Sequence, residues 1–192
     1  MLAQQTTAGN EVIMNYQQVL NFWFEEIDQT QWWIKDAVFD NTISSKFLAM
    51  HQAANRGELY HWRVMPEGRL AEIIVLDQFS RNIFRDTPKA FASDALALIL
   101  AQEAIGLGVD AKLPNIKRSF MYLPFMHSES LVIHNEAVNL YQQLGNESSL
   151  AFELKHRDII EKFGRYPHRN AILNRQSSQV ELEFLRQPNS SF

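Results

Sequence analysis

Apolar residues along this chain recur at intervals of three and four positions, the spacing that places side chains on one face of an α-helix. Alternation of apolar and polar residues, which would indicate strands, is almost absent. The spacing predicts a helix after Asn15, a residue type that favours the N-cap position, and a second helix from about 36 to 55. A third apolar helix is predicted to follow Pro66 and to run through Arg81.

Helix boundaries in the second half of the chain are marked by capping residues. Thr87 suits an N-cap, Pro88 the first helical position and Gly106 the C-cap of the helix between them. Ser178 and Glu181 have the spacing of a capping box that opens a short last helix.

Three further helices are expected between these boundaries. One carries Phe120 and Leu123 and is predicted to be interrupted at Pro124. The other two cover 131–144 and 150–163, and each is followed by a glycine. Together the pattern predicts an all-α fold of about eight to ten helices stacked in pairs.

The ends of the chain and the lack of a linker bear on its organisation. We expect one helical domain over residues 15–187, with flexible tails at 1–14 and 188–192. The first residues have no apolar core of a signal peptide, and no stretch is apolar for long enough to span a bilayer. These observations predict a cytoplasmic protein without membrane contact.

Composition excludes several kinds of chemistry. The chain has 192 residues, of which 46% are hydrophobic, and a formal net charge of −4, which argues against nucleic acid as a partner. Cysteine is absent, so disulfides, thiolate metal sites and cysteine nucleophiles are excluded. No spacing of histidines and acids selects a metal and no phosphate-binding glycine loop is present, so no cofactor is predicted.

The first of three polar clusters is LDQFSRNIFR, from Leu76 to Arg85. Asp77 and Arg81 stand four residues apart, with the acid first, so they can pair on one helix face. Because the segment continues an apolar helix, this pair is expected to be partly buried. The cluster is predicted either to bind an anion or to clamp two helices together; its candidate ligand-binding residues are Asp77, Gln78, Arg81 and Arg85.

The second cluster surrounds His127, in RSFMYLPFMHSE. We considered His127 as a general base that Glu129 orients, which requires contact in space rather than a particular spacing. A histidine at a helix entrance more often bonds to the backbone, so the structural interpretation stays open.

The third cluster, HRDIIEKFGRYPHRN, is locally basic in an acidic protein. A glycine and a proline are expected to hold its turn rigid, so the arginines can present guanidinium groups to a carboxylate or a phosphate. They could instead tie the loop to helix ends. The candidate ligand-binding residues are His156, Arg165, Arg169 and Asn170, with His168 as a second candidate for proton transfer.

The aromatic segments have two interpretations. FWF at Phe22–Phe24, the pair Trp32 and Trp33, and Trp62 are most simply core residues because they follow helical spacing. Exposed apolar surface at Trp32 and Trp33 could also support a homodimer.

These segments resemble the DUF924 family, a bacterial family of unknown function. The resemblance rests on FWF, LDQFSRNIFR, AFASD, YLPFMHSE and FGRYPHRN, and covers about Val19 to Leu185. It implies a tetratricopeptide-like α-α superhelix and no established activity. Asn174 stands where the family usually has glycine, a change that asparagine tolerates because it accepts a left-handed conformation; Ser178 replaces a common threonine and retains the cap.

Two classes of function follow from these residues. In the first, which we favour slightly, the clusters converge on a groove that binds an anionic small molecule or an acidic peptide. In the second, the chain is an enzyme that acts on a phosphate- or carboxylate-bearing substrate by general acid–base catalysis. A deep pocket with a histidine in contact with a carboxylate would favour the enzyme. A purely structural role for the clusters, in a protein-interaction scaffold, is the third alternative.

Overall fold

The structure is a computed structural model that describes residues 14–188 and residue 190. The predicted flexible tails therefore lie largely outside the described residues. Within the described part every regular element is helical and no strand is present, which confirms the all-α prediction. The α-helices are α1 Tyr16–Asn21, α2 Ala37–Asn55, α3 Pro66–Ile74, α4 Ser80–Ile83, α5 Asp94–Gly106, α6 Asn115–Met126, α7 Leu131–Leu144, α8 Glu147–Phe163 and α9 Gln179–Leu185.

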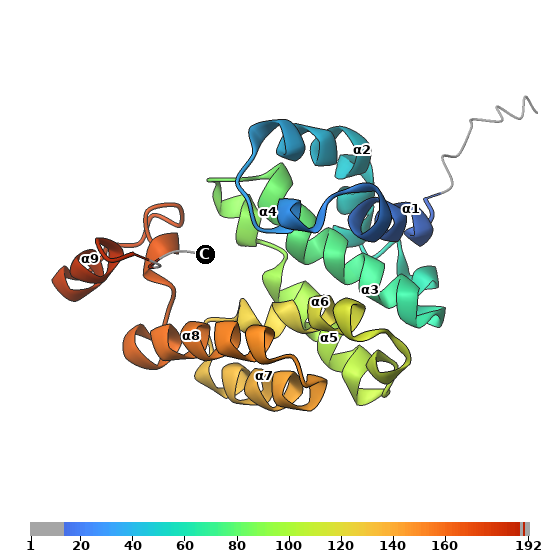
Figure 1. Ribbon diagram of the computed structural model, residues 1–192. Coiled ribbons are helices and arrows are strands. Elements are labelled where there is room, and N and C mark those ends of the chain that lie inside the picture. The colour runs from blue at the N-terminus through green and yellow to red at the C-terminus, as the bar shows by residue number, and fades with distance from the viewer. Residues whose placement is uncertain (1–13, 189, 191–192) are drawn as a thin grey trace, which may run out of the picture.

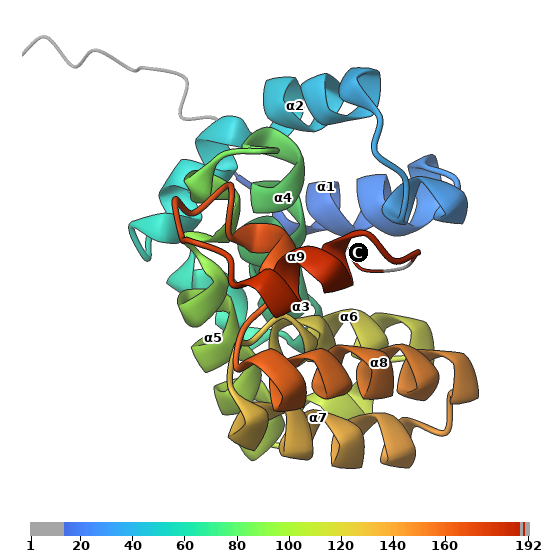
Figure 2. The same ribbon diagram turned by 90° about the vertical axis from the view of Figure 1, so that its left-hand side faces the viewer.

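The helices form two groups that meet along α3 (Figures 1 and 2). Helices α1, α2 and α4 lie on one side of α3, and α6, α7 and α8 pack on one another on the other side, with α5 against both α3 and α6. Helix α9 docks at the edge beside the turn that follows α8. This packing of neighbouring helices is compatible with the expected superhelix. None of the helices in the described residues is long and apolar enough to cross a membrane.

Aromatic side chains from the π-helical stretches that follow α1 and α3, Phe22–Glu26 and Val75–Phe79, pack against α6 in the core. The ring of Trp23 lies 5.5 Å from that of Phe79 and 5.9 Å from that of Phe120, and all three are fully buried. Trp62 is also buried, in agreement with the core interpretation of these residues. Trp33 differs because it is 66% exposed, while Trp32 beside it is partly buried and donates its indole N–H to the Trp23 carbonyl. A homodimer through this surface stays a prediction.

Several local predictions at helix ends are confirmed. Asn15 and Ser178 each cap a helix with the reciprocal hydrogen bonds of a capping box. Gly145 and Gly164 end their helices in the left-handed conformation. Asn174, with φ of 54°, adopts the left-handed conformation that the family's usual glycine suggests.

Three boundary predictions need correction, one of them because the C-cap of α5 is Leu107 rather than Gly106. Thr87 takes the N-cap position and Pro88 the first helical position, but of a short 3₁₀ helix, Pro88–Phe91, and α5 begins only at Asp94. The Thr87 hydroxyl makes no capping bond because it donates to the Phe84 carbonyl. Likewise, α6 continues through Pro124. A proline removes only its own N–H, and the ladder resumes where His127 N–H donates to the Leu123 carbonyl at 2.9 Å, so the cost is confined to the last turn.

The capping box of α9 yields a stability prediction. Ser178→Ala removes the hydroxyl that accepts the Glu181 N–H, and we expect it to lower the free energy of unfolding by about 1 kcal/mol. Urea denaturation measures the change. Ser45→Ala is the matched control, since Ser45 is an exposed serine whose hydroxyl bonds within α2, and we expect a change of less than about 0.5 kcal/mol. Equal effects of the two substitutions would show that the cap contributes nothing.

Candidate functional site

Asp77 lies in a π-helical stretch, Val75–Phe79, inserted between α3 and α4. Such stretches are rare and frequent at functional sites, because the wider turn changes which residues face the core. Here all five residues are buried, Asp77 being 1% exposed. The Gln78 side-chain amide donates to Asp77 Oδ2 at 2.6 Å. The expectation that this polar segment is buried is therefore confirmed.

Two partners share the other oxygen of the Asp77 carboxylate. Arg81 Nη1 lies 3.2 Å from Asp77 Oδ1 and also donates to the Asp77 carbonyl at 2.7 Å, which confirms the predicted pair. His127, at the end of α6, places Nδ1 at 2.8 Å from the same Oδ1. Residues 50 positions apart in sequence thus form an aspartate–histidine pair.

Electrostatics fix the protonation of this pair. Burial by itself raises the pKa of Asp77, but Arg81 and His127 lower it more, so the net pKa lies below its ordinary value. Burial and Arg81 lower the pKa of His127 more than Asp77 raises it. At neutral pH the aspartate is therefore charged and the imidazole neutral. The Nδ1–H donates to Asp77, and Nε2 is left with a lone pair and no hydrogen-bond partner among the described residues.

Asp94, the first residue of α5, connects two arginines. Arg81 donates to both of its oxygens, at 2.9 and 3.1 Å. Arg169 reaches the same carboxylate only at 3.4 Å, and its other terminal nitrogen donates to the His127 carbonyl at 3.1 Å. Asp94 was not among the candidate residues, although it closes the AFASD segment on which the family resemblance partly rests.

Arg169 packs against two aromatic rings. Its guanidinium carbon lies 4.6 Å from the ring centres of both Phe91 and Tyr166, and its side chain is 8% exposed. Tyr166 is itself fixed, since its hydroxyl donates to the Met126 carbonyl at 2.5 Å. Burial and the nearby Arg81 lower the pKa of Arg169, in contrast to the other candidate arginines. The Nε atom of Arg169 is buried without a partner among the described residues.

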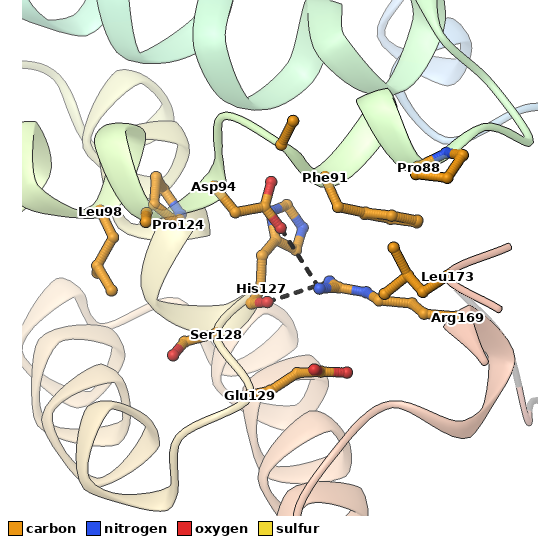
Figure 3. Close-up of a pocket in the computed structure, with 12 residues that line it drawn as sticks. Pro88, Phe91, Asp94, Leu98, Pro124, His127, Ser128, Glu129, Arg169 and Leu173 are labelled. Carbon is orange, nitrogen blue, oxygen red and sulfur yellow. Dashed lines mark hydrogen bonds and ion pairs between the residues drawn. The ribbon is translucent and has the colours of Figure 1, made fainter. Parts of the chain in front are cut away.

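A cavity of about 400 Å³ opens beside this cluster (Figure 3). Its polar lining is formed by Asp94, His127, Ser128, Glu129 and Arg169. Apolar lining comes from Pro88, Phe91, Leu98, Pro124 and Leu173. A pocket of this size suits a small molecule rather than a folded partner.

A second buried pair supports the pocket. His134 Nδ1 lies 2.7 Å from Glu153 Oε1, and both side chains are 0% exposed. The Nε2–H of His134 donates to the carbonyl of Ser128, which lines the pocket, at 2.9 Å. Sequence patterns gave no indication of this pair, because its members lie on α7 and α8 and neither belongs to a motif.

Of the four predicted anion-binding arginines, Arg81, Arg85 and Arg165 are absent from the described pocket lining. Arg85 makes a two-point contact with Asp40, at 2.5 and 2.7 Å, and Arg165 makes one with Glu181, at 2.7 and 2.8 Å. The hydrogen bonds that each arginine donates to its carboxylate raise the pKa of that arginine. The expectation that all four arginines converge is therefore wrong, because a bidentate acid already occupies each of these two guanidinium groups.

Glu129 does not orient His127. Its carboxylate accepts two hydrogen bonds from Arg175, at 2.6 and 2.9 Å, and a third from the Tyr166 N–H at 2.8 Å. The role expected of Glu129 is taken by Asp77. Glu129 nevertheless lines the pocket, so its negative charge faces any ligand there.

The remaining candidates lie outside the pocket lining. The His156 Nδ1–H donates to the Phe152 carbonyl at 2.8 Å, and burial lowers the pKa of His156 to about 3. Burial and Arg169 lower the pKa of His168 to about 4. Asn170 donates to Ser177 Oγ at 3.0 Å and to Glu181 at 3.3 Å. Of the two histidines predicted for proton transfer, the one that lines the pocket is His127.

Metal ligands are not gathered anywhere in the part of the chain that the structure describes: no group of three or more histidine, aspartate or glutamate side chains could hold an ion.

Comparisons with known proteins place the chain among uncharacterised relatives. A family model described as a bacterial protein of unknown function (DUF924) matches residues 19–189. A solved structure of a protein of unknown function from Agrobacterium tumefaciens is 40% identical, with a TM-score of 0.85 over 89% of this chain and 96% of that one. No curated protein matches the chain.

Proposed function

The chain belongs to the DUF924 family, and we propose that it is an enzyme that acts on an anionic small molecule by general acid–base catalysis in the pocket beside His127. The observation that carries this proposal is the contact of His127 Nδ1 with Asp77 at 2.8 Å, which leaves Nε2 without a partner among the described residues. A neutral imidazole held by a carboxylate is the arrangement that general-base catalysis requires.

In this proposal Asp77 is the positioning residue. Its carboxylate holds the Nδ1–H, so Nε2 is the nitrogen that takes a proton from a water molecule or a substrate hydroxyl. The negative charge of Asp77 then stabilises the imidazolium that forms. The partly exposed side chain of His127, at 16%, gives substrate access that the fully buried His134 lacks.

Arg169 supplies the contact for the anionic group. Arg81 is held by Asp77 and by both oxygens of Asp94, which leaves it little capacity for a ligand. Arg169 has five N–H donors and makes two hydrogen bonds within the described residues, one of them at 3.4 Å. The present partners of Arg169 neutralise its buried positive charge incompletely, and a ligand anion would complete that neutralisation.

Binding without chemistry is the second candidate function. It is favoured by the same incompletely neutralised positive charge of Arg169, because an anion would stabilise that buried charge whether or not a reaction follows. The two candidates differ in what they require of His127, because only catalysis needs a reactive nitrogen in the pocket.

Chemical modification tests the first requirement, an accessible neutral imidazole. Diethyl pyrocarbonate acylates the lone pair of a neutral imidazole nitrogen, and peptide mass spectrometry identifies the modified residue. We expect His127 to react in the folded protein and the 0%-exposed His134 to stay unmodified. If His127 stayed unmodified while the exposed His61 reacted fully, the proposed base would lack access.

Turnover tests the second requirement. The probes are two anionic chromogenic compounds, p-nitrophenyl phosphate and the p-nitrophenyl monoester of succinate. We expect the wild-type protein to hydrolyse at least one of them, and His127→Gln to reduce that rate at least about 100-fold. His61→Gln, at an exposed histidine outside the pocket, is the matched control and retains the rate. Equal rates for wild type and His127→Gln on both probes would favour binding without chemistry.

A further inference from the structure

We infer that the pocket takes a monocarboxylate with a short apolar body, rather than a phosphate or a polyanion. This inference rests on the proposed function, since it names the substrate class of the same site. Three features of the pocket carry it: its balance of charge, the donors that Arg169 offers and the apolar wall beyond His127.

The charges around the pocket sum to zero. This sum counts the lining residues Asp94, Glu129 and Arg169 together with their ion-pair partners behind the lining. The carboxylates are those of Asp77, Asp94 and Glu129, and the guanidinium groups are those of Arg81, Arg169 and Arg175. A ligand with one negative charge is balanced when His127 takes a proton. A second negative charge on the ligand would have no counter-charge and would lie against the carboxylates of Asp94 and Glu129 in the lining.

Arg169 offers the geometry of a carboxylate contact. Its guanidinium carbon lies 4.6 Å from the ring centres of both Phe91 and Tyr166, and these rings leave its N–H groups for hydrogen bonds. A planar fork of N–H donors matches the two oxygens of a carboxylate. Lysine and glycine, which commonly accompany phosphate, are absent from the described pocket lining.

The rest of the lining suits an apolar body. Figure 3 shows Arg169 and Leu173 on one side of His127, and Leu98 and Pro124 on the other. A carboxylate at Arg169 therefore directs the remainder of the ligand past His127 toward Leu98. The volume of about 400 Å³ lies near the lower end of small-molecule pockets, which limits the body to a short chain or a single ring.

A matched series of probes tests the class of ligand. Hexanoate, 1-hexanol, hexyl phosphate and pyrophosphate are compared by calorimetry and by NMR titration of the His127 ring. We expect hexanoate to bind at least tenfold more tightly than each of the others and to raise the pKa of His127. Tightest binding of hexyl phosphate or pyrophosphate would overturn the inference, and so would binding of hexanol as tight as that of hexanoate.

Two neighbouring residues of α5 provide matched variants that do not touch the buried charges. Leu98→Asn removes the apolar wall and is expected to weaken hexanoate binding at least tenfold while leaving acetate binding unchanged. Ile99→Asn changes a residue that is 59% exposed and absent from the described pocket lining, and it should leave the affinities for hexanoate and for acetate unchanged. Equal hexanoate affinity in the two variants would contradict the proposed body site.

Failure of this inference is distinguishable from failure of the proposed function. If none of the four probes binds, the ligand class is wrong. Modification of His127 and the turnover of chromogenic probes do not depend on that series. If His127 were reactive but hexanoate did not bind, the inference of a monocarboxylate ligand would be overturned, and the proposed role of His127 as a catalytic base would stand.

Discussion

Replacing Asp77 with alanine is expected to lower the free energy of unfolding by about 3–5 kcal/mol. The carboxylate is 1% exposed and holds Arg81, His127 and Gln78 together. Its removal leaves the Arg81 guanidinium with the charge of Asp94 alone and leaves the Nδ1–H of His127 without an acceptor. Because buried donors cannot turn to water, the cost of desolvating them is no longer offset.

Urea denaturation followed by circular dichroism measures this change. Glu161→Ala is the matched control, because it removes a carboxylate from an exposed i,i+4 pair with Arg157, and we expect less than about 0.5 kcal/mol. If Asp77→Ala cost no more than Glu161→Ala, the pair with His127 would contribute nothing to stability. The same variant separates the contribution of Asp77 to stability from its role in orienting His127. At a urea concentration where Asp77→Ala is still folded, the reactivity of His127 toward diethyl pyrocarbonate should change because the ring is no longer oriented.

Acidification from about pH 6.5 to about pH 4.5 is expected to remove about 2–3 kcal/mol of stability through each of two buried histidines, His156 and His168. In the unfolded chain a histidine takes up a proton near pH 6.5. In the folded protein burial lowers the pKa of His156 to about 3 and that of His168 to about 4. Between those values the unfolded state binds more protons, so stability falls as the pH falls.

Denaturation at a series of pH values tests this in single variants. His156→Gln and His168→Gln should each flatten the slope by their own share, and the double variant by both shares. Glu153 acts in the opposite direction, because burial raises its pKa, so the comparison of each variant with wild type isolates the histidine. Identical pH profiles for wild type and the double variant would show that neither histidine is kept neutral by the fold.

The two predictions concern two groups of residues that support the same pocket. Asp77 and Arg81 hold the pocket from the side of α3 and α4, whereas His156 and His168 pack on Tyr166, with ring centres 5.8 and 5.5 Å from it. Tyr166 in turn lies against Arg169. Arg169, the proposed anion-binding residue, is therefore supported by a buried aromatic ring with neutral histidines beside it. Acid is expected to loosen that support before it protonates Asp77, whose pKa is lowered.

The sequence by itself determined the helices and many of their ends. Helical spacing and caps such as Asn15 and Ser178 depend on residues within a few positions of one another, so local sequence contains the information. The pair of Asp77 with Arg81 was accessible for the same reason, since its members lie one helical turn apart. At Thr87 the prediction was only partly right: the residue takes the N-cap position of a 3₁₀ helix, but its hydroxyl donates to the Phe84 carbonyl, a local partner that spacing cannot rank against a cap.

Only the tertiary structure decided which charges meet in the pocket. Asp94 and Arg169 are 75 residues apart, and Asp40 and Arg85 are 45 apart, so no helical period relates them. Whether each arginine is saturated or keeps N–H donors to offer depends on an acid from another helix, Asp40 for Arg85, Glu181 for Arg165 and Asp94 for Arg169. Partner choice depends on how α3, α5, α6 and the turn after α8 pack. The sequence therefore identified residue types suited to an anion site, and the packing of distant helices determined that Arg169 and His127 are the ones that line the pocket of the proposed site.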